Sequence, residues 1–321
     1  MKLEDIGFLE VIENRARSIS PGKVSYCEWI ITSKCNFKCP YCNSLPENKV
    51  PANISLDKAK EIIDILAGMS CKYVHITGGE PTTLSNLPEI ISYLKSKGIR
   101  SGLSSNGSRT LNYYQNLISC GTELFSLSLD IHKKELNKKF TLVSNNVFDT
   151  VVRNIRELSK EVYVNVGIVL NDDNIEYAND VIEFVSELGV HDIRIMTATK
   201  YNQINKLDIR QELLDKHKIL KYRVNNFNEG KNIRGSHLGR SRKCHLVRDD
   251  ITIAGEDYYP CAVYAREGGE PIGKFGPDNE QGRMKWFMEH NSYEDEICKK
   301  FCMDFKCRFN EKVEYWKITH R

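Results

Sequence analysis

The 321-residue sequence lacks the apolar run that a membrane span requires, since no stretch approaches roughly 18 consecutive apolar residues. It also lacks the pattern of a secretory signal peptide, because the first twenty residues, MKLEDIGFLEVIENRARSIS, are charged throughout. It contains no internal repeat and no low-complexity tract. We therefore expect a soluble, cytoplasmic protein without a membrane partner, and the 40% of apolar residues allows a sizeable core.

A strong overall charge is absent too, because 46 basic residues are offset by 43 acidic ones. The basic residues are unevenly placed, with 13 Lys and Arg against 4 Asp and Glu in residues 200–248. Proteins that bind nucleic acid are usually basic overall and place aromatic residues among the charges for stacking. Nucleic acid is therefore not an expected partner.

Short β-rich runs alternate with segments of helical apolar spacing over the first 200 residues. The expected strands are residues 24–32, 73–77, 100–105, 124–129, 162–170 and 192–196. Six strand–helix units in succession predict an α/β fold with a parallel sheet and helices outside, either open or partly closed as a partial (β/α)6 barrel. One further amphipathic helix is expected at residues 209–227.

The expected domains are a lead-in at residues 1–23, a core at residues 24–228 and a small cysteine-rich, cluster-binding extension at residues 229–321. Polar motifs follow the expected strands of the core, among them TGGEP at residues 77–81 and SSNG at residues 104–107. Ligands of parallel sheets bind at the carboxyl ends of the strands. The motifs therefore predict one shared site at that edge.

Eleven cysteines without a secretion signal favour metal binding or redox chemistry over disulfides. Cys35, Cys39 and Cys42 form a C-x3-C-x2-C loop with no fourth Cys or His nearby. Structural zinc usually takes four ligands, whereas three thiolates on a four-iron cluster leave one iron open to a small molecule. Half of a zinc site is the alternative.

This loop, with Tyr41 before its last cysteine, resembles the signature of the radical S-adenosylmethionine (radical SAM) enzymes, and the resemblance covers roughly residues 24–200. It implies a [4Fe–4S] cluster on Cys35, Cys39 and Cys42 whose open iron binds SAM. It also implies reductive cleavage of SAM to a 5′-deoxyadenosyl radical that takes hydrogen from a substrate. A flavodoxin- or ferredoxin-type protein would be the electron donor.

The other motifs match that family in order, and the resemblance implies that they surround SAM. The expected SAM-binding residues are Tyr41, Gly78, Gly79, Glu80, Ser105, Asn106, Ser128 and Asp130. Taken alone, GGEP is also a common helix-entry turn, and Ser128 and Asp130 could be strand-end caps. The local sequence around these motifs is most similar to the branch that contains the molybdenum-cofactor cyclase. The chain ends KITHR without that enzyme's C-terminal Gly-Gly, so its reaction is not expected here.

Five further cysteines occupy the last 78 residues. They are Cys244, Cys261, Cys298, Cys302 and Cys307. With a Gly-x4-Pro-Cys turn, they resemble the SPASM or Twitch extension of radical SAM enzymes, although the late spacings differ from the usual ones. The resemblance implies one auxiliary [4Fe–4S] cluster, on the first four cysteines with Cys307 spare, or with Cys302 and Cys307 as ligands and Cys298 spare. A zinc site is the remaining alternative.

A spare thiol at Cys307 could donate a hydrogen atom to a substrate radical, or it could pack as a small apolar group. Cys27, Cys71 and Cys120 stand alone in or beside expected strands, and burial in the core is expected for them.

The basic stretch at residues 231–248 has three interpretations. Arg240 and Arg242 could clamp a phosphate or carboxylate of the substrate, since guanidinium groups bind such anions in a bidentate manner. The stretch could instead compensate the negative charge of a cluster on Cys244, or dock an acidic electron donor.

The expected function is that of a radical SAM oxidoreductase, epimerase or related tailoring enzyme of a biosynthetic pathway. Only 23 residues precede the first expected strand, which favours a small polar substrate, sugar-like or phosphorylated, over a peptide that needs a leader-binding appendage. Dehydrogenation, epimerisation and rearrangement all stay open. A ribosomally made peptide is the alternative substrate, and an electron carrier or a zinc-stabilised binding module is the non-enzymatic alternative.

Overall fold

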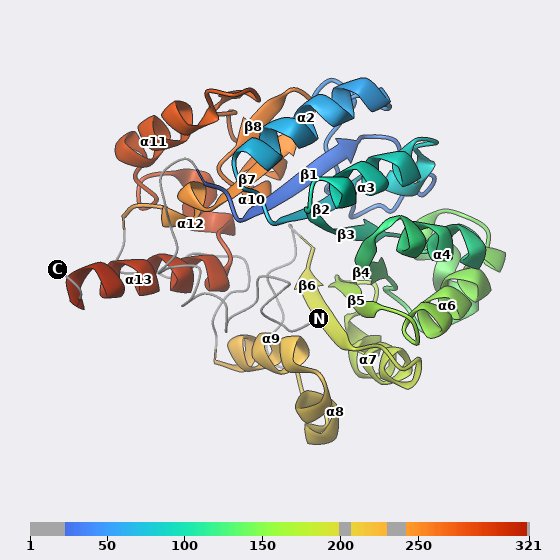
Figure 1. Ribbon diagram of the computed structural model, residues 1–321. Helices are drawn as coiled ribbons and strands as arrows, with labels where there is room; N and C mark the ends of the chain where they lie inside the picture. The colour runs from blue at the N-terminus through green and yellow to red at the C-terminus, as the bar shows by residue number, and fades with distance from the viewer. Residues whose placement is uncertain (1–22, 199–206, 230–241, 320–321) are drawn as a thin grey trace.

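Figure 1 shows the computed structural model, which describes residues 23–198, 207–229 and 242–319. Within these ranges nine strands form one sheet in the order β6-β5-β4-β3-β2-β1-β7-β8-β9. β1 to β7 pair in parallel, and β8 and β9 are antiparallel. The strands are β1 (Tyr26–Thr32), β2 (Tyr73–Gly78), β3 (Arg100–Ser105), β4 (Thr122–Ser128), β5 (Tyr163–Leu170), β6 (Asp192–Thr197), β7 (Asp250–Ala254), β8 (Asp257–Tyr259) and β9 (Gly273–Lys274). The expected α/β fold is confirmed, and each expected strand agrees with an observed one to within two residues.

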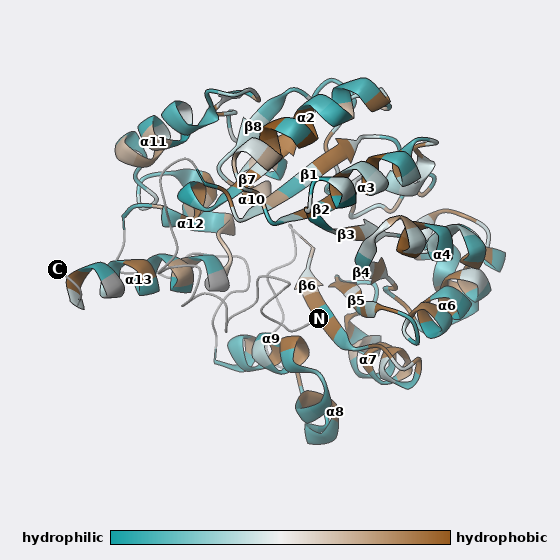
Figure 2. Cartoon of the chain, in the orientation of Figure 1, coloured by the Kyte–Doolittle hydropathy of each residue, from teal (hydrophilic) through white to brown (hydrophobic). Residues whose placement is uncertain are grey.

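Helices follow the first five strands and cover the outer side of the curved sheet (Figure 1). They are α2 (Leu56–Gly68), α3 (Leu87–Ser96), α4 (Leu111–Cys120), α5 (Asn137–Thr141), α6 (Asn146–Leu158) and α7 (Ala178–Glu187). Their apolar sides pack on alternate strand residues such as Trp29, Ile76 and Phe125, which form the main core. Figure 2 shows the result, with long hydrophobic stretches on β1 and β6 and mixed colours on the helices. Among the described helices, none is long and apolar enough to pass through a lipid bilayer.

The single helix expected at residues 209–227 is wrong, because two helices occupy this segment. α8 (Gln211–Lys216) and α9 (Lys218–Asn228) meet at His217, whose backbone is extended. The carboxylate of Asp192, at the start of β6, accepts hydrogen bonds from the backbone N–H of Ile219 and Leu220. These bonds satisfy the first donors of α9, so the break is stabilised by a distant residue while the apolar spacing continues across it.

The C-terminal region extends the same sheet, since β7 pairs with β1. Its helices are α10 (Ala262–Arg266), α11 (Asn279–Glu289), α12 (Glu296–Phe301) and α13 (Asp304–Thr319). Ile30 of β1, Leu45 and Val50 of the cysteine loop, and Ala254 and Tyr259 of the C-terminal strands share a small apolar cluster. The C-terminal region therefore packs directly on the loop that carries the first cysteine motif.

Candidate active site

The three-cysteine loop leaves the carboxyl end of β1 and runs to α2. None of its thiols forms a disulfide; Cys35 and Cys39 are partly buried and Cys42 is exposed. The backbone N–H of Cys42 donates to the carbonyl of Cys39 (3.0 Å), which closes a tight turn. Burial, followed by the charges of Asp130, Cys42 and Cys35, raises the pKa of Cys39 to about 12. The charges of Cys35 and Cys42 thus reach Cys39, so the three thiols lie near one another on this loop.

The glycines of the GGEP turn hold this loop in place. The backbone N–H of Gly79 donates to the carbonyl of Thr32, and that of Glu80 donates to the carbonyl of Lys34, each at 2.7 Å. A Cβ on Gly79 would lie 2.6 Å from the carbonyl oxygen of Ser33 and closer still to that of Lys34. Only glycine allows this approach of two backbones.

Glu80 connects the same turn to the end of β3. Its carboxylate is 1% exposed and accepts hydrogen bonds from the backbone N–H of Asn106 (2.6 Å), from the Ser105 hydroxyl (2.9 Å) and from Thr82. The amide of Asn106 in turn donates to Asn36 of the cysteine loop (2.8 Å). The structure therefore brings the second and third sequence motifs against the first, with Glu80 as their shared hydrogen-bond acceptor.

Tyr41 links the cysteine loop to β4 and β5. Its hydroxyl donates to the Asp130 carboxylate (2.5 Å), whose other oxygen accepts from the backbone N–H of Val169 (2.6 Å). Burial raises the pKa of Asp130 to about 6. Asn174 donates to the backbone carbonyls of Asp130 and Val169, and Ser128 is exposed at the end of β4. All eight residues expected around SAM thus belong to the carboxyl edge of the sheet.

Two asparagines of this site were missed by sequence reasoning. Asn36 lies between the cysteines and Asn174 lies after β5. Each acts by a hydrogen bond to a residue distant in sequence, and neither belongs to a spacing pattern that could have identified it.

A second group of thiols lines one cavity of about 50 Å³ in the C-terminal region. The five are Cys244, Cys261, Cys298, Cys302 and Cys307. A water molecule needs roughly 10–15 Å³, so the cavity has room for a group of several atoms. Burial, followed by Cys244, Asp295, Cys261 and Cys302, raises the pKa of Cys298. Cys307 approaches Cys302, with 3.6 Å between the two sulfur atoms.

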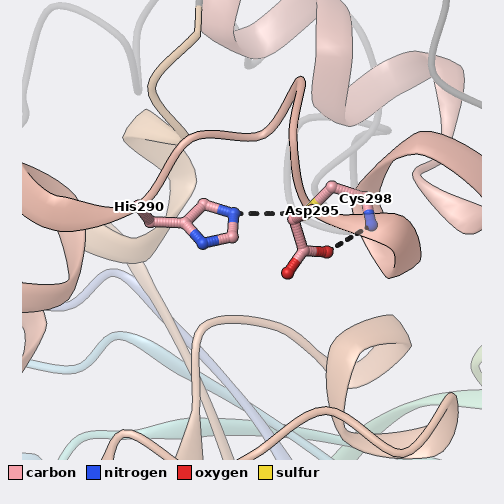
Figure 3. Close-up of side chains that lie close together, drawn as sticks. All are labelled: His290, Asp295 and Cys298. Atoms are coloured by element: carbon pink, nitrogen blue, oxygen red, sulfur yellow. Dashed lines mark hydrogen bonds between the residues drawn. The ribbon is translucent and has the colours of Figure 1, made fainter.

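A histidine and an aspartate that were not expected stand beside this cavity. Figure 3 shows the ring of His290 directed at Cys298, with 3.4 Å between Nε2 and Sγ. The Asp295 carboxylate accepts from the backbone N–H of Cys298 (2.8 Å) and from the Tyr264 hydroxyl (3.0 Å). The His290 ring stacks on Trp286 at 3.9 Å. One ligand atom from each of His290, Asp295 and Cys298 falls within 4.8 Å of the others.

Lys306 is buried in the same cavity. Burial alone would lower the pKa of Lys306, but the neighbouring Cys261, Cys302 and Glu28 hold it above its ordinary value. A buried ammonium beside thiols suits a negatively charged group bound by those thiols.

The comparison with family models concerns the N-terminal part of the chain. Residues 29–185 match the sequence model of the Radical SAM superfamily. These residues are a radical SAM domain. The chain is similar to the probable GTP 3',8-cyclase of Metallosphaera sedula, with 29% identity over 170 residues, which are 52% of this chain and 53% of that protein. It is also similar to the mycofactocin maturase MftC of Mycolicibacterium smegmatis, with 28% identity over 164 residues, which are 50% of this chain and 41% of that protein.

The chain spans about half the length of the curated relatives it matches. These relatives are named enzymes, which agrees with the expectation of a radical SAM enzyme. Among solved structures, anSMEcpe with bound AdoMet and a peptide has a TM-score of 0.59 at 15% identity, covering 92% of this chain and 97% of that chain. SuiB of Streptococcus suis has a TM-score of 0.57 at 13% identity, covering 86% and 65%. At these identities the likeness shows the fold.

The radical SAM domain implies SAM and one [4Fe–4S] cluster, and the residues fit the cluster. The donor set at the first site is three thiols on one loop, without a disulfide, which is the ligand type that iron–sulfur clusters take. At the second site five thiols share a cavity with a buried ammonium.

The remaining expected residues have mixed outcomes. Cys27 and Cys71 are buried, as expected, whereas Cys120, at the end of α4 and just before β4, is only partly buried. Arg242 is exposed, and Arg240 lies outside the described residues, so their role as an anion clamp stays a prediction.

Proposed function

We propose that the chain binds a [4Fe–4S] cluster through Cys35, Cys39 and Cys42 and cleaves SAM reductively. One observation carries the proposal: a loop with three free thiols is held by the GGEP turn at the carboxyl edge of a parallel sheet. When bound, the reduced cluster supplies the electron that breaks the SAM sulfonium, giving methionine and a 5′-deoxyadenosyl radical that abstracts hydrogen from the substrate. A flavodoxin- or ferredoxin-type donor would deliver that electron.

The chain's own residues position the reactants. Gly79 and Glu80 fix the cysteine loop by their backbone N–H groups, and Tyr41 fixes its far end through Asp130. We assign SAM binding to Tyr41, Gly78, Gly79, Glu80, Ser105, Asn106, Ser128 and Asp130. The apolar cluster that the loop shares with the C-terminal region holds the loop against the sheet.

Anaerobic incubation with SAM and dithionite tests the proposal. We expect the reconstituted protein to form 5′-deoxyadenosine, measured by liquid chromatography, and Cys39→Ala to form none. Cys120→Ala is the matched control, since Cys120 ends α4 away from the loop. An iron-loaded wild-type protein that forms no 5′-deoxyadenosine would disprove the function.

We further propose that Cys244, Cys261, Cys298 and Cys302 hold an auxiliary [4Fe–4S] cluster, as in a SPASM- or Twitch-like extension at residues 229–321, next to a core at residues 24–228. The proposal is supported by the mutual effect of these thiols, since the pKa of Cys298 is raised by Cys244, Cys261 and Cys302 after burial. Cys307 is then the spare thiol that approaches Cys302. Its use as a hydrogen-atom donor remains a prediction.

Metal analysis separates the auxiliary cluster from a zinc site. In the zinc alternative, His290 and Asp295 would bind the zinc ion together with Cys298. Two clusters predict about eight iron atoms and about eight sulfides per anaerobically purified chain. About four irons with one zinc would favour the zinc site, and His290→Ala would then release the zinc.

For the substrate we propose a small polar metabolite, sugar-like or phosphorylated, that is dehydrogenated, epimerised or rearranged. A peptide is the second candidate, because SuiB was solved bound to precursor peptide SuiA and anSMEcpe with a peptide. The transfer of deuterium from a labelled substrate to 5′-deoxyadenosine discriminates between the metabolite and the peptide. Deuterated metabolite and peptide fractions of the source cell are supplied in turn, and deuterium in 5′-deoxyadenosine identifies the fraction that contains the substrate.

A further inference from the structure

The inner face of the curved sheet is polar, in contrast to its outer face. Glu28 lies between core residues of β1, and His75, Ser126 and Arg194 likewise lie between core residues of β2, β4 and β6. Neighbouring residues of each strand, such as Ile193 and Ile195 beside Arg194, are buried in the core under the helices. Since side chains alternate between faces, these polar residues all point to the inner side. Such a face is suited to hold a polar ligand rather than to pack as a core.

Two arginines converge on this inner face from distant parts of the chain. Arg194 donates to the Ser126 hydroxyl (3.1 Å), and its guanidinium lies beside Gly167 of β5. Arg266, the last residue of α10, donates to the hydroxyl of Thr77 (3.3 Å) and pairs with Glu28 (3.4 Å). The sheet brings the two together although four strands separate β6 from β1.

Electrostatics supports this convergence. Burial lowers the pKa of Arg194, Glu28 raises it and Arg266 lowers it again. Burial also lowers the pKa of His75 to about 4, so this ring is neutral near pH 7. One carboxylate, that of Glu28, faces both arginines, so the two guanidinium groups share a single negative charge. The cluster therefore has an excess of positive charge.

Both arginines also have a hydrogen-bond donor to spare. Among the described residues, no acceptor bonds the buried Nε of Arg194 or that of Arg266. Buried donors on charged groups are usually satisfied, and an unsatisfied pair on one polar face indicates a missing acceptor. A carboxylate or phosphate has the charge and the oxygen geometry to fill this place.

We propose that Arg194 and Arg266 bind an anionic group, a carboxylate or a phosphate, of the substrate on the inner face of the sheet. The inference rests on the proposed function, since it names the substrate class of that site. α10 carries Cys261 at its N-cap and Arg266 at its last residue, so the same helix that serves the second cavity orients the substrate. Without the anion, Arg266 forms an ion pair with Glu28, and the bound anion would replace Glu28 in this contact.

Inorganic phosphate is the probe, titrated by calorimetry into the reconstituted full chain saturated with SAM. We expect one saturable site that Arg194→Gln and Arg266→Gln each weaken at least tenfold. Arg194→Lys and Arg266→Lys, which keep the charge but lose the planar fork, should give intermediate affinities. Arg100→Gln is the matched control, because Arg100 belongs to the same sheet but pairs with Glu123 at its opposite end, and it should bind within twofold of wild type.

Glu28→Gln should increase the affinity for phosphate, a result that a misfolded variant would not give. It removes the carboxylate that competes for Arg266, so phosphate should bind at least threefold more tightly. The proposal is overturned by the absence of saturable binding, by Arg194→Gln and Arg266→Gln variants that bind like Arg100→Gln, or by phosphate binding that SAM abolishes. The last result would assign the arginines to the carboxylate of SAM. Formation of 5′-deoxyadenosine is measured separately, so a failure of the proposed function is distinguished from a failure of this inference.

Discussion

Replacing Gly79 by alanine tests whether the GGEP turn positions the three-cysteine loop. The new Cβ would lie 2.6 Å from the carbonyl oxygen of Ser33 and closer to that of Lys34, and both are backbone atoms that cannot rotate away. The loop must therefore shift. The shift would break the hydrogen bonds from Gly79 N–H to Thr32 and from Glu80 N–H to Lys34.

The cost can be estimated from these contacts. Inserting a methyl into a tight contact costs about 1–3 kcal/mol, and each lost hydrogen bond costs about 0.5–1.5 kcal/mol. The free energy of unfolding should thus fall by about 2–6 kcal/mol. Gly68→Ala is the matched control, since Gly68 ends helix α2 and a methyl group there would meet no atom of another segment within 4 Å. It should stabilise the chain by up to about 1 kcal/mol.

Urea unfolding of the full chain, followed by circular dichroism, measures both variants, and iron content after reconstitution reports on the loop. We expect Gly79→Ala to lose the first cluster, about four irons per chain, while Gly68→Ala retains it. A Gly79→Ala chain with the stability and the iron content of wild type would refute the close approach of the turn to the loop.

Three further predictions follow from single contacts. Tyr41→Phe removes the donor to Asp130 and should lower the free energy of unfolding by about 1–3 kcal/mol in urea; an unchanged midpoint would contradict this bond. His217 has a pKa lowered by burial to about 4, so the unfolded chain binds its proton more tightly and stability is lost as pH falls from about 6.5 to 4. His217→Gln should remove about 3 kcal/mol of this pH dependence, measured by urea titrations across that range, and an equally steep profile would refute it. Cys307→Ala should retain all iron while Cys298→Ala loses about four atoms per chain, and the reverse result would make Cys307 the ligand.

Several features could be predicted from the sequence because their signals are local. The strand positions follow from alternation within six to eight residues, and the helices from apolar residues at helical spacing. The C-x3-C-x2-C loop and the GGEP turn are likewise contiguous, so the thiols and the glycines that hold them were identified together. The helix break at His217 was not predicted, because the carboxylate that stabilises it belongs to Asp192 on another element.

The sequence alone determined that the chain is an α/β protein with one three-cysteine loop at the sheet edge and five cysteines near its end. Only the tertiary structure decided that those five share a cavity with Lys306, that His290 lies beside Cys298, and that Arg194 and Arg266 meet on the inner face. The physical reason is distance along the chain. Spacing patterns specify contacts within a helix or a strand, whereas the approach of residues many elements apart depends on sheet curvature and on how the whole core packs.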